Sequence, residues 1–428
     1  MDAVGADATT IDADAALSCD KLQYKCNDKC VNCDVGTASD TSRLSFSCSG
    51  QGACVVACAS PYTSCGAGAT QRCLDLKSDL YNCGWCDRAC GTSNDPGTCN
   101  QGQCVAKAVA SLSDVTGSFL IHTSGKMYFH DQKRVYRCDT PDCANREPLY
   151  TGTFEALPLA QGLAIASAGA TSYAYFVGKQ SGSSTTSLVR CALVSTCVEP
   201  EIYVSNMTSL ALFGGSDSLF SFDGQKLFFI DVTANPASAV RYEIAKYKWT
   251  PSRFALTADA IFDASLDNGV HRVARTACPN PDTSPCSPNA FVDVALARPS
   301  TIEARSEVLY FNDATTGAIF SCPPSGCANP IAVAVGNQLG AASLHSDGSN
   351  LAWTYHSPNG LADEVRMCAP SGGACSASKV YAIASQQRNA TQVRLGSKGT
   401  LYWFSTGADD SDAGSAAAIR RGYAPSVK

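Results

Sequence analysis

The stretch VLYFNDATTGAIFSCPPSGCANPIAVA, residues 308–334, decides the fold of this chain. It opens with an apolar aromatic run around Leu309, turns, and ends a second apolar run at Cys322. A tight Pro/Gly turn then carries Cys327, and a third apolar run follows. Short runs rich in aromatic and β-branched residues between such turns are typical of β-strands. The stretch therefore predicts three short strands with a cysteine pair across the second turn.

The aromatic triplet of this stretch recurs along the chain as MYF, AYF, LFF, IFD, LYF, LAW and LYW. The triplets begin at Met127, Ala174, Leu227, Ile261, Leu309, Leu351 and Leu401, with spacings of 34 to 53 residues. A period of about 40 to 50 residues is typical of β-propellers, whose blades each contain four strands. We therefore predict an all-β fold with a seven-bladed β-propeller. A six-bladed propeller is the alternative if the short copy at Ile261 is an insertion.

Each triplet is expected in the second strand of its blade, after a glycine-containing hairpin turn. FLIHTSGKMYF (119–129) and LFSFDGQKLFF (219–229) show this order, with Gly125 and Gly224 where a tight turn needs a positive φ. The triplet aromatics could form a stacking site for a cofactor or a sugar, but their place in regular strands favours packing between blades. These aromatic residues are Tyr128, Tyr175, Phe228, Tyr310, Trp353 and Tyr402.

Ten cysteines form five close pairs within the repeats. The pairs are Cys138/Cys143, Cys191/Cys197, Cys278/Cys286, Cys322/Cys327 and Cys368/Cys375. Each spans the expected turn between the third and fourth strands, so we predict disulfides that clamp the outer hairpins. Closing so short a loop is worth about 2 kcal/mol in the chain-entropy model. A metal site would need converging ligands, and no histidine lies near most pairs. The third and seventh copies lack a pair.

The seventh copy ends after its third strand, whereas VAKAVASL (105–112) precedes the first copy without a blade of its own. We therefore predict that residues 105–112 supply the outer strand of the last blade and close the ring, which removes a free sheet edge. The propeller domain is expected to span residues 105–428.

Fourteen of the 24 cysteines lie between Cys19 and Cys104. This segment has few large apolar side chains, so disulfides must supply its stability. We predict a small disulfide-rich domain at 19–104 with two degenerate copies, 19–57 and 58–104, seven disulfides and a connectivity that the sequence does not define. Residues 1–18 hold four aspartates and no basic residue, which is typical of a disordered tether.

The CxxC pairs Cys30/Cys33 and Cys83/Cys86 raise the alternative of a zinc or redox site. The many neighbouring cysteines and the absence of histidine before His122 favour disulfides. Cysteines this dense and even in number indicate an oxidising compartment. We therefore expect an extracellular or outer-surface location, reached with an export signal that has since been removed.

The segment CLDLKSDLYNCGWCDRAC, followed by CNQGQC, resembles the cysteine module of the stigma-specific protein family, which is widespread in exported bacterial proteins. The matching positions are Cys73, Asp75, Ser78, Asp79, Asn82, Cys83, Gly84, Cys86, Cys90, Cys99, Gly102 and Cys104. The repeats around LYF and SCP resemble bacterial secreted propellers of the YWTD-like type. These resemblances imply an extracellular or surface-anchored location and imply no reaction.

Composition excludes several classes of protein. Only 16% of the residues are charged and the formal net charge is −6, with no dense lysine/arginine cluster. Nucleic acid is therefore not an expected partner, because phosphate binding needs concentrated positive charge. No run of 18 apolar residues exists, so no transmembrane segment is expected.

Few residues suggest chemistry. The sequence contains no GxSxG, HExxH or P-loop pattern, and we predict no catalytic, cofactor-binding or metal residues apart from one weak calcium candidate. That candidate is the loop with Asp409, Asp410 and Asp412, which lacks the full EF-hand spacing. Asn206 and Asn389 begin N-x-Thr sequons and are candidate glycosylation sites.

The sequence thus favours an exported, non-enzymatic binding or structural scaffold at the cell surface, one form of which is a self-assembling subunit of a fibre or coat. The expected partner is a protein or a glycan. Two alternatives stay open: a secreted carbohydrate-active enzyme that uses the centre of the propeller, and a calcium-dependent adhesin. Propellers gather acid/base residues from different blades, so no local motif would reveal such an enzyme.

Overall fold

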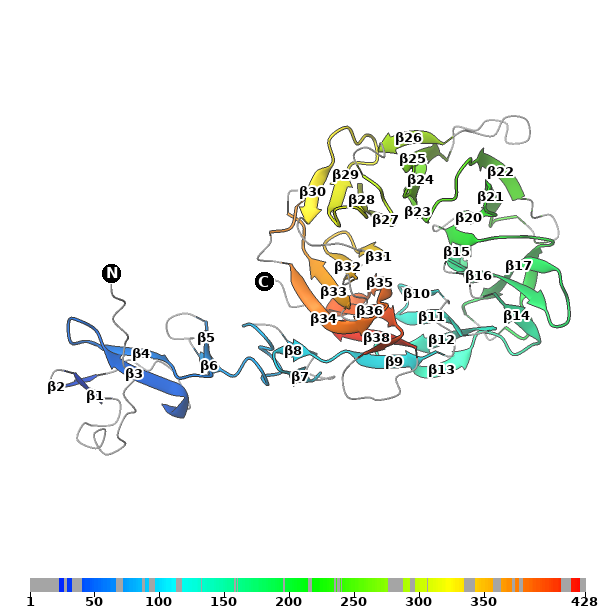
Figure 1. Cartoon of the computed structure of the whole chain (residues 1–428). Helices are drawn as coiled ribbons and strands as arrows, with labels where there is room; N and C mark the ends of the chain where they lie inside the picture. The colour runs from blue at the N-terminus through cyan, green and yellow to red at the C-terminus, as the bar shows by residue number, and fades with distance from the viewer. Residues whose placement is uncertain are drawn as a thin grey trace. The chain divides into compact units, whose positions relative to one another are not determined.

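Seven antiparallel sheets follow one another around a ring in the computed structural model of this protein (Figure 1). The ring lies in the second of two units, Met1–Val105 and Ala106–Lys428. The structure describes residues 23–26, 29–32, 41–66, 72–86, 89–91, 97–112, 118–131, 133–157, 159, 161–194, 197–214, 218–234, 236, 239, 241–275, 288–292, 297–305, 307–334, 343–356, 363–371, 374–376, 380–408 and 417–423.

Each sheet is one blade with four strands in sequence order from the centre outward. Blade 1 contains β10 (Phe119–Ile121), β11 (Lys126–Asp131), β12 (Arg134–Asp139) and β13 (Ala144–Pro148). Blade 2 contains β15 (Leu163–Ala168), β16 (Thr171–Gln180), β17 (Thr186–Ala192) and β18 (Glu201–Val204), with β14 (Phe154–Ala156) also paired to β16. Blade 3 contains β19 (Ala211–Gly214), β20 (Ser218–Phe222), β21 (Lys226–Asp231) and β22 (Arg241–Lys246).

The remaining blades repeat this order. Blade 4 contains β23 (Arg253–Leu256), β24 (Ala260–Ser265), β25 (Gly269–Ala274) and β26 (Asn289–Val292). Blade 5 contains β27 (Ile302–Arg305), β28 (Val308–Asn312), β29 (Ile319–Cys322) and β30 (Ile331–Ala334). Blade 6 contains β31 (Ser343–Ser346), β32 (Leu351–Tyr355), β33 (Asp363–Cys368) and β34 (Tyr381–Arg388), with β37 (Gly407–Ala408) beside β34. Blade 7 contains β35 (Thr391–Leu395), β36 (Thr400–Ser405), β38 (Ala418–Tyr423) and β9 (Lys107–Ser111).

Burial of apolar side chains between blades explains why these segments form a ring. The propeller contains seven buried apolar clusters, and each joins residues of two neighbouring blades. Tyr128 of blade 1, for example, lies in one cluster with Phe176 of blade 2. Seven interfaces for seven blades confirm the predicted seven-bladed propeller and rule out the six-bladed alternative. The triplet aromatics are buried, as packing between blades requires.

The third copy was assigned to the wrong strand. The LFF triplet at Leu227 lies in β21, the third strand of blade 3, whereas β20 occupies the second position. Likewise RYEIAK (241–246) forms β22, the fourth strand of blade 3, and is not the third strand of that copy. Counting blade 3 from Leu219 in β20 gives spacings of 45 and 42 residues to the triplets at Ala174 and Ile261. The short repeat that suggested six blades therefore disappears.

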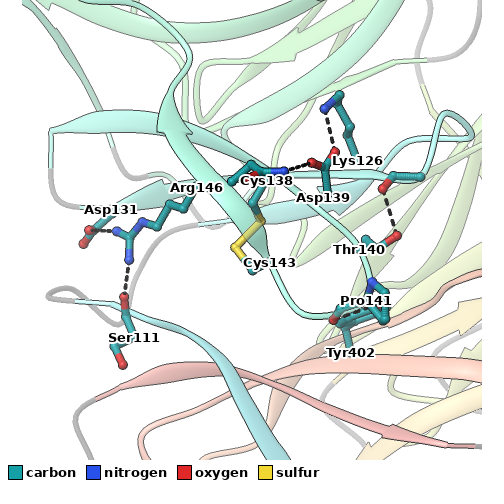
Figure 2. Close-up of a disulfide and its surroundings, with 12 residues drawn as sticks. Ser111, Lys126, Asp131, Cys138, Asp139, Thr140, Pro141, Cys143, Arg146 and Tyr402 are labelled. Carbon is teal, nitrogen blue, oxygen red and sulfur yellow. Dashed lines mark hydrogen bonds and ion pairs between the residues drawn. A yellow bond between two sulfur atoms is a disulfide. The ribbon is translucent and has the colours of Figure 1, made fainter. Parts of the chain in front are cut away.

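Disulfides join the third and fourth strands of several blades. The structure contains Cys138–Cys143, Cys191–Cys197, Cys322–Cys327 and Cys368–Cys375. Cys278 and Cys286 lie outside the described residues. Figure 2 shows the first bond at the turn after β12, where Lys126 and Asp139 form an ion pair beside it.

The ring closes between the two ends of the propeller chain. Strand β9, from the stretch 105–112, pairs antiparallel with β38 and forms the outer strand of blade 7. The turn of the Cys138–Cys143 disulfide carries Asp142, whose carboxylate lies 2.8 Å from Lys107 Nζ and 2.7 Å from Arg421 Nη1. In Figure 2, Arg146 of β13 also reaches this edge and donates to the Ser111 carbonyl at 3.0 Å. Blade 1 thus contacts both strands that close the ring, β9 through Lys107 and Ser111 and β38 through Arg421.

The N-terminal unit is built from two-stranded hairpins. Its strands are β1 (Gln23–Cys26), β2 (Lys29–Asn32), β3 (Leu44–Cys48), β4 (Cys54–Cys58), β5 (Thr63–Cys65), β6 (Arg72–Leu74), β7 (Cys99–Asn100) and β8 (Gln103–Cys104). The part of the chain that the structure describes contains the short 3-10 helices η2 (Thr41–Arg43), in this unit, and η6 (Ser397–Gly399), in the ring. Within the described residues, no helix is long and apolar enough to cross a membrane.

Disulfides form the interior of this unit. Its disulfides include Cys58–Cys73, Cys65–Cys86, Cys83–Cys99 and Cys90–Cys104. Among the described residues of the unit, the fully buried side chains are those of Cys65, Cys83, Cys90 and Cys104. The two hairpins that the similar stretches CSGQGAC and CNQGQC form, β3–β4 and β7–β8, are alike, but the division into copies at 19–57 and 58–104 stays a prediction.

Candidate functional site

Five ionisable side chains gather on the innermost strands of four consecutive blades. They are Arg253 of β23, Glu303 and Arg305 of β27, His345 of β31 and Arg394 of β35. These strands are neighbours in that order and lie nearest the centre of the ring (Figure 1). Arg305 is exposed and the other four side chains are partly exposed, so solvent reaches them. We call this group the inner-strand arginine cluster.

The charges of the inner-strand arginine cluster act on one another. Burial raises the pKa of Glu303 to about 7, although Arg394 and Arg253 favour its charged form. Burial and, to a smaller extent, the charge of Arg394 together lower the pKa of Arg253 to about 10. Loss of water around the charged forms therefore outweighs the attraction between these groups. Near neutral pH the cluster carries three guanidinium charges and at most one carboxylate charge.

His345 is the neutral member of the cluster. Its Nδ1 accepts a hydrogen bond from the Leu395 backbone N–H at 3.2 Å. Burial and then the charge of Arg394 hold the pKa of His345 well below its usual range. A neutral imidazole whose Nδ1 accepts carries its proton on Nε2, so His345 offers one neutral donor. His122, which occupies the similar place in blade 1, instead pairs its Nδ1 with Ser124 Oγ at 2.8 Å. Blade 7 lies between the blades that carry these two histidines.

A second arrangement pairs a histidine with a buried carboxylate. Nδ1 of His356 lies 2.6 Å from Asp363 Oδ2, and that oxygen also accepts from the Ala390 backbone N–H at 2.9 Å. Asp363 is fully buried, whereas the His356 side chain is 30% exposed. The carboxylate therefore orients the imidazole through Nδ1 and leaves Nε2 outside this contact. This geometry suits a general base or a metal ligand.

His130 has a different role. It lies fully buried on β11, and neither ring nitrogen has a hydrogen-bond partner among the described residues. Its ring meets Phe176 of the next blade edge-on. Burial lowers the pKa of His130 to about 4, with a smaller opposing effect of the Gly162 backbone. His130 is thus a packing residue that must stay neutral.

Acidification should destabilise the ring through His130. Below pH 6.5 the unfolded chain protonates this histidine, whereas the folded chain keeps it neutral until about pH 4. The unfolded state then binds more protons, and the free energy of unfolding falls by about 1.4 kcal/mol per pH unit. Urea unfolding of wild type and His130→Phe between pH 7 and 4.5 measures this loss, which the variant should lack. His122→Gln, at a partly exposed histidine, should keep most of it. Equal slopes for His130→Phe and wild type would contradict the assignment.

The remaining candidates from the sequence fall in different places. Asp409, Asp410 and Asp412 lie outside the described residues, so the calcium loop stays a prediction. Asn206 and Asn389 are both exposed at turns with positive φ, where a glycan could attach. Asn389 Nδ2 donates to Thr406 Oγ1 at 3.0 Å. Their glycosylation also stays a prediction.

The sulfur atoms of Cys83, Cys90 and Cys104 lie within 4.8 Å of one another, a spacing that would suit a metal. All three sulfur atoms are part of the disulfides Cys83–Cys99 and Cys90–Cys104, so these cysteines offer no thiolate ligand. The Cys83/Cys86 pair does not bond internally, because Cys86 pairs with Cys65. No free cysteine occurs among the described residues.

Sequence reasoning missed the inner-strand arginine cluster. Its members come from four blades and no two blades contribute the same pattern, so no local motif marks them. The useful signal would have been the residue type in the first strand of each copy. Blades 4 to 7 place a charged or imidazole side chain there, whereas β19 of blade 3 carries ALFG.

No protein-family model and no curated protein matches this chain. Among solved structures, it is similar to selenomethionine-substituted virginiamycin B lyase from Staphylococcus aureus, with a TM-score of 0.50 and 12% identity, over 75% of this chain and 99% of that one. It is also similar to the computationally designed Ika8 protein, with a TM-score of 0.47 and 8% identity, over 77% of this chain and 89% of that one. Such low identities show the fold alone. The chain is a seven-bladed β-propeller protein with an N-terminal disulfide-rich region, and these matches assign it no family.

Proposed function

We propose that this protein is an exported, non-enzymatic binding or structural protein that acts outside the cell or on its outer surface. The observation that carries the proposal is the set of disulfides at the outer hairpins of the ring, such as Cys322–Cys327. Outer strands have the fewest neighbours, and a covalent clamp there resists fraying and proteolysis. Disulfides of this kind persist in oxidising compartments. The resemblance of the N-terminal unit to the stigma-specific protein module and of the blades to YWTD-like secreted propellers supports the same location.

The expected partner is a protein or a glycan at the cell surface, and self-assembly into a fibre or coat is one form of this function. The test is fractionation of native cells with thiol alkylation before lysis, followed by negative-stain microscopy of the surface fraction. We expect the protein in the extracellular or surface fraction with Cys322 and Cys327 unalkylated. Recovery from the cytosol with alkylated cysteines would overturn the proposal. Filaments that contain the protein would support the structural form, and dispersed particles would support the binding form.

A second candidate, a secreted carbohydrate-active enzyme, is favoured by one observation. His356 Nδ1 lies 2.6 Å from the buried Asp363 carboxylate, and the His356 side chain is 30% exposed. An oriented imidazole of this kind can remove a proton from a substrate. Incubation with a panel of polysaccharides tests the enzyme, with His356→Gln as the matched control. Product that forms with wild type and not with the variant would replace the non-enzymatic proposal.

A further inference from the structure

Several arginines of the ring that lie away from its centre have a carboxylate partner. Arg137 Nε lies 2.7 Å from Glu147 and Arg190 Nε lies 2.7 Å from Glu201, in each case on the next strand. Arg366 Nε lies equally close to Glu364. Arg275 instead donates to backbone carbonyls and to Ser218 Oγ. A carboxylate partner is therefore the common, though not the universal, rule for arginines outside the centre.

The inner-strand arginine cluster departs from this rule. Among the described residues, none of Arg253, Arg305 and Arg394 has a carboxylate oxygen within the 4.0 Å of an ion pair. The one hydrogen bond of these three side chains runs from Arg394 Nη1 to the Val393 carbonyl at 2.9 Å. All three arginine charges lower the pKa of Glu303, but none of them lies at ion-pair distance from its carboxylate. Most guanidinium donors of the cluster therefore remain available.

Gathering three cations at the centre of a ring is unfavourable without a counterion. Like charges near one another destabilise the folded state, and partial burial removes the water that would screen them. The pKa directions of Arg253 and Arg394, both lowered by burial, reflect that cost. A fold that only needed packing at these positions would place apolar residues there, as blade 3 does with Phe213. Among the described residues, the three guanidinium charges of the cluster thus lack a counterion at ion-pair distance.

We propose that the inner-strand arginine cluster binds an oxyanion group, such as a carboxylate, sulfate or phosphate, on the extracellular partner of this protein. The planar guanidinium matches the two oxygens of such a group with parallel hydrogen bonds. The Nε2–H of His345 adds a neutral donor beside the arginines. The Arg394 guanidinium carbon lies 6.0 Å from the centroid of the buried Phe119 ring. This inference rests on the proposed binding function and names the chemistry that the ligand must carry.

Glu303 limits the affinity of the site at high pH. Its carboxylate faces Arg253, Arg305, Arg394 and the neutral His345, and as an anion it competes with the ligand for the same cations. Because its pKa is about 7, Glu303 is largely neutral at pH 6 and charged at pH 8. The site therefore gains one positive charge as the pH falls across this range. Anion binding should strengthen accordingly.

Isothermal titration calorimetry on the full chain tests the site with three probes: glucuronate, inorganic sulfate and inorganic phosphate. We expect one-to-one binding of at least one probe at low ionic strength, weakened by added salt. Arg253→Gln and Arg394→Gln should each weaken it roughly tenfold, the scale of one lost charge-assisted hydrogen bond. Arg272→Gln removes the same charge from β25, where Asp259 pairs with it at 3.0 Å. That control should bind within about twofold of wild type, since charges far from the ligand are screened. The preferred probe identifies the oxyanion.

The variant Glu303→Gln gives the site a readout that a folding defect cannot imitate. It should bind the preferred probe roughly tenfold more tightly than wild type at pH 8 and about equally at pH 6, since only the charged carboxylate competes. Failure of all three probes to bind folded wild type would overturn the proposal. So would unchanged binding by a folded Arg394→Gln protein. Either outcome leaves the surface location and the scaffold function standing, because those depend on fractionation and disulfide state.

Discussion

Removal of two disulfides from the N-terminal unit is expected to unfold that unit while the ring stays folded. The variant replaces Cys83, Cys99, Cys90 and Cys104 by alanine. The fully buried side chains that the structure describes in this unit are cysteines, so the two bonds are also its interior. They close loops of 16 and 14 residues, worth about 3 kcal/mol each in the chain-entropy model. The bonds Cys58–Cys73 and Cys65–Cys86 remain in the variant, but the described residues of this unit show no apolar core that could replace the two lost bonds.

Limited proteolysis with mass mapping of the cuts measures this effect. We expect new cuts between residues 58 and 104 and an unchanged thermal transition for the ring. The matched control is Cys322→Ala with Cys327→Ala, which removes one short clamp from the ring. It should leave the N-terminal unit resistant and lower the stability of the ring by about 2 kcal/mol. Continued resistance of residues 58–104 in the fourfold variant would show that an apolar core exists there.

The contrast between these variants follows from where each unit keeps its apolar surface. The ring buries aromatic and aliphatic side chains in seven clusters between blades, and its disulfides add to a fold that already has a core. Cys322 and Cys327 are themselves buried members of one of these clusters, beside apolar side chains such as Phe311. Among the described residues of the N-terminal unit, the buried cluster consists of cysteines alone. The same bond is therefore supplementary in one unit and indispensable in the other.

The blade count was predictable because the repeat period is set by the whole blade. Seven triplets at roughly regular spacing required seven sheets, and the sheets were found. The error in blade 3 arose because SLFSF and KLFF are both aromatic strands joined by a tight turn. Second and third strands of a blade bury similar residues, so local pattern could not tell them apart. Only the pairing of β20 with β19 decides the position.

The candidate site was not predictable for a related reason. A charged residue in an inner strand looks like any polar residue at a strand end when it is read alone. Arg253 and Arg394 are more than 100 residues apart in the chain, yet the charge of Arg394 lowers the pKa of Arg253. Ring closure alone brings blades 4 and 7 to a common centre. The chemistry of the cluster is therefore a property of the closed ring.

Closure is expected to fail when a charge is buried in the closing strand. Ala110 of β9 is 4% exposed and lies opposite Ile419 of β38, in the cluster that joins blade 7 to blade 1. Ala110→Asp would place a carboxylate there without a partner, which costs roughly 3 to 5 kcal/mol. Because β9 and the rest of blade 7 come from opposite ends of the propeller chain, its loss would expose the edge of β38. We expect a fall of about 4 to 7 °C in the thermal midpoint for a ring of this size, or aggregation.

Ala108→Asp is the matched control, since it adds the same charge to the same strand at an exposed position opposite Arg420. It should change stability by less than about 0.5 kcal/mol, the usual range for surface substitutions. Differential scanning calorimetry of both variants separates closure from a general effect of charge on β9. Equal midpoints for Ala110→Asp and Ala108→Asp would mean that β9 does not hold the ring together. In that case β38 would hold the ring closed through its own contacts with blade 1, such as the ion pair of Arg421 with Asp142. The ion pair of Lys107 with Asp142 would then not be needed for closure.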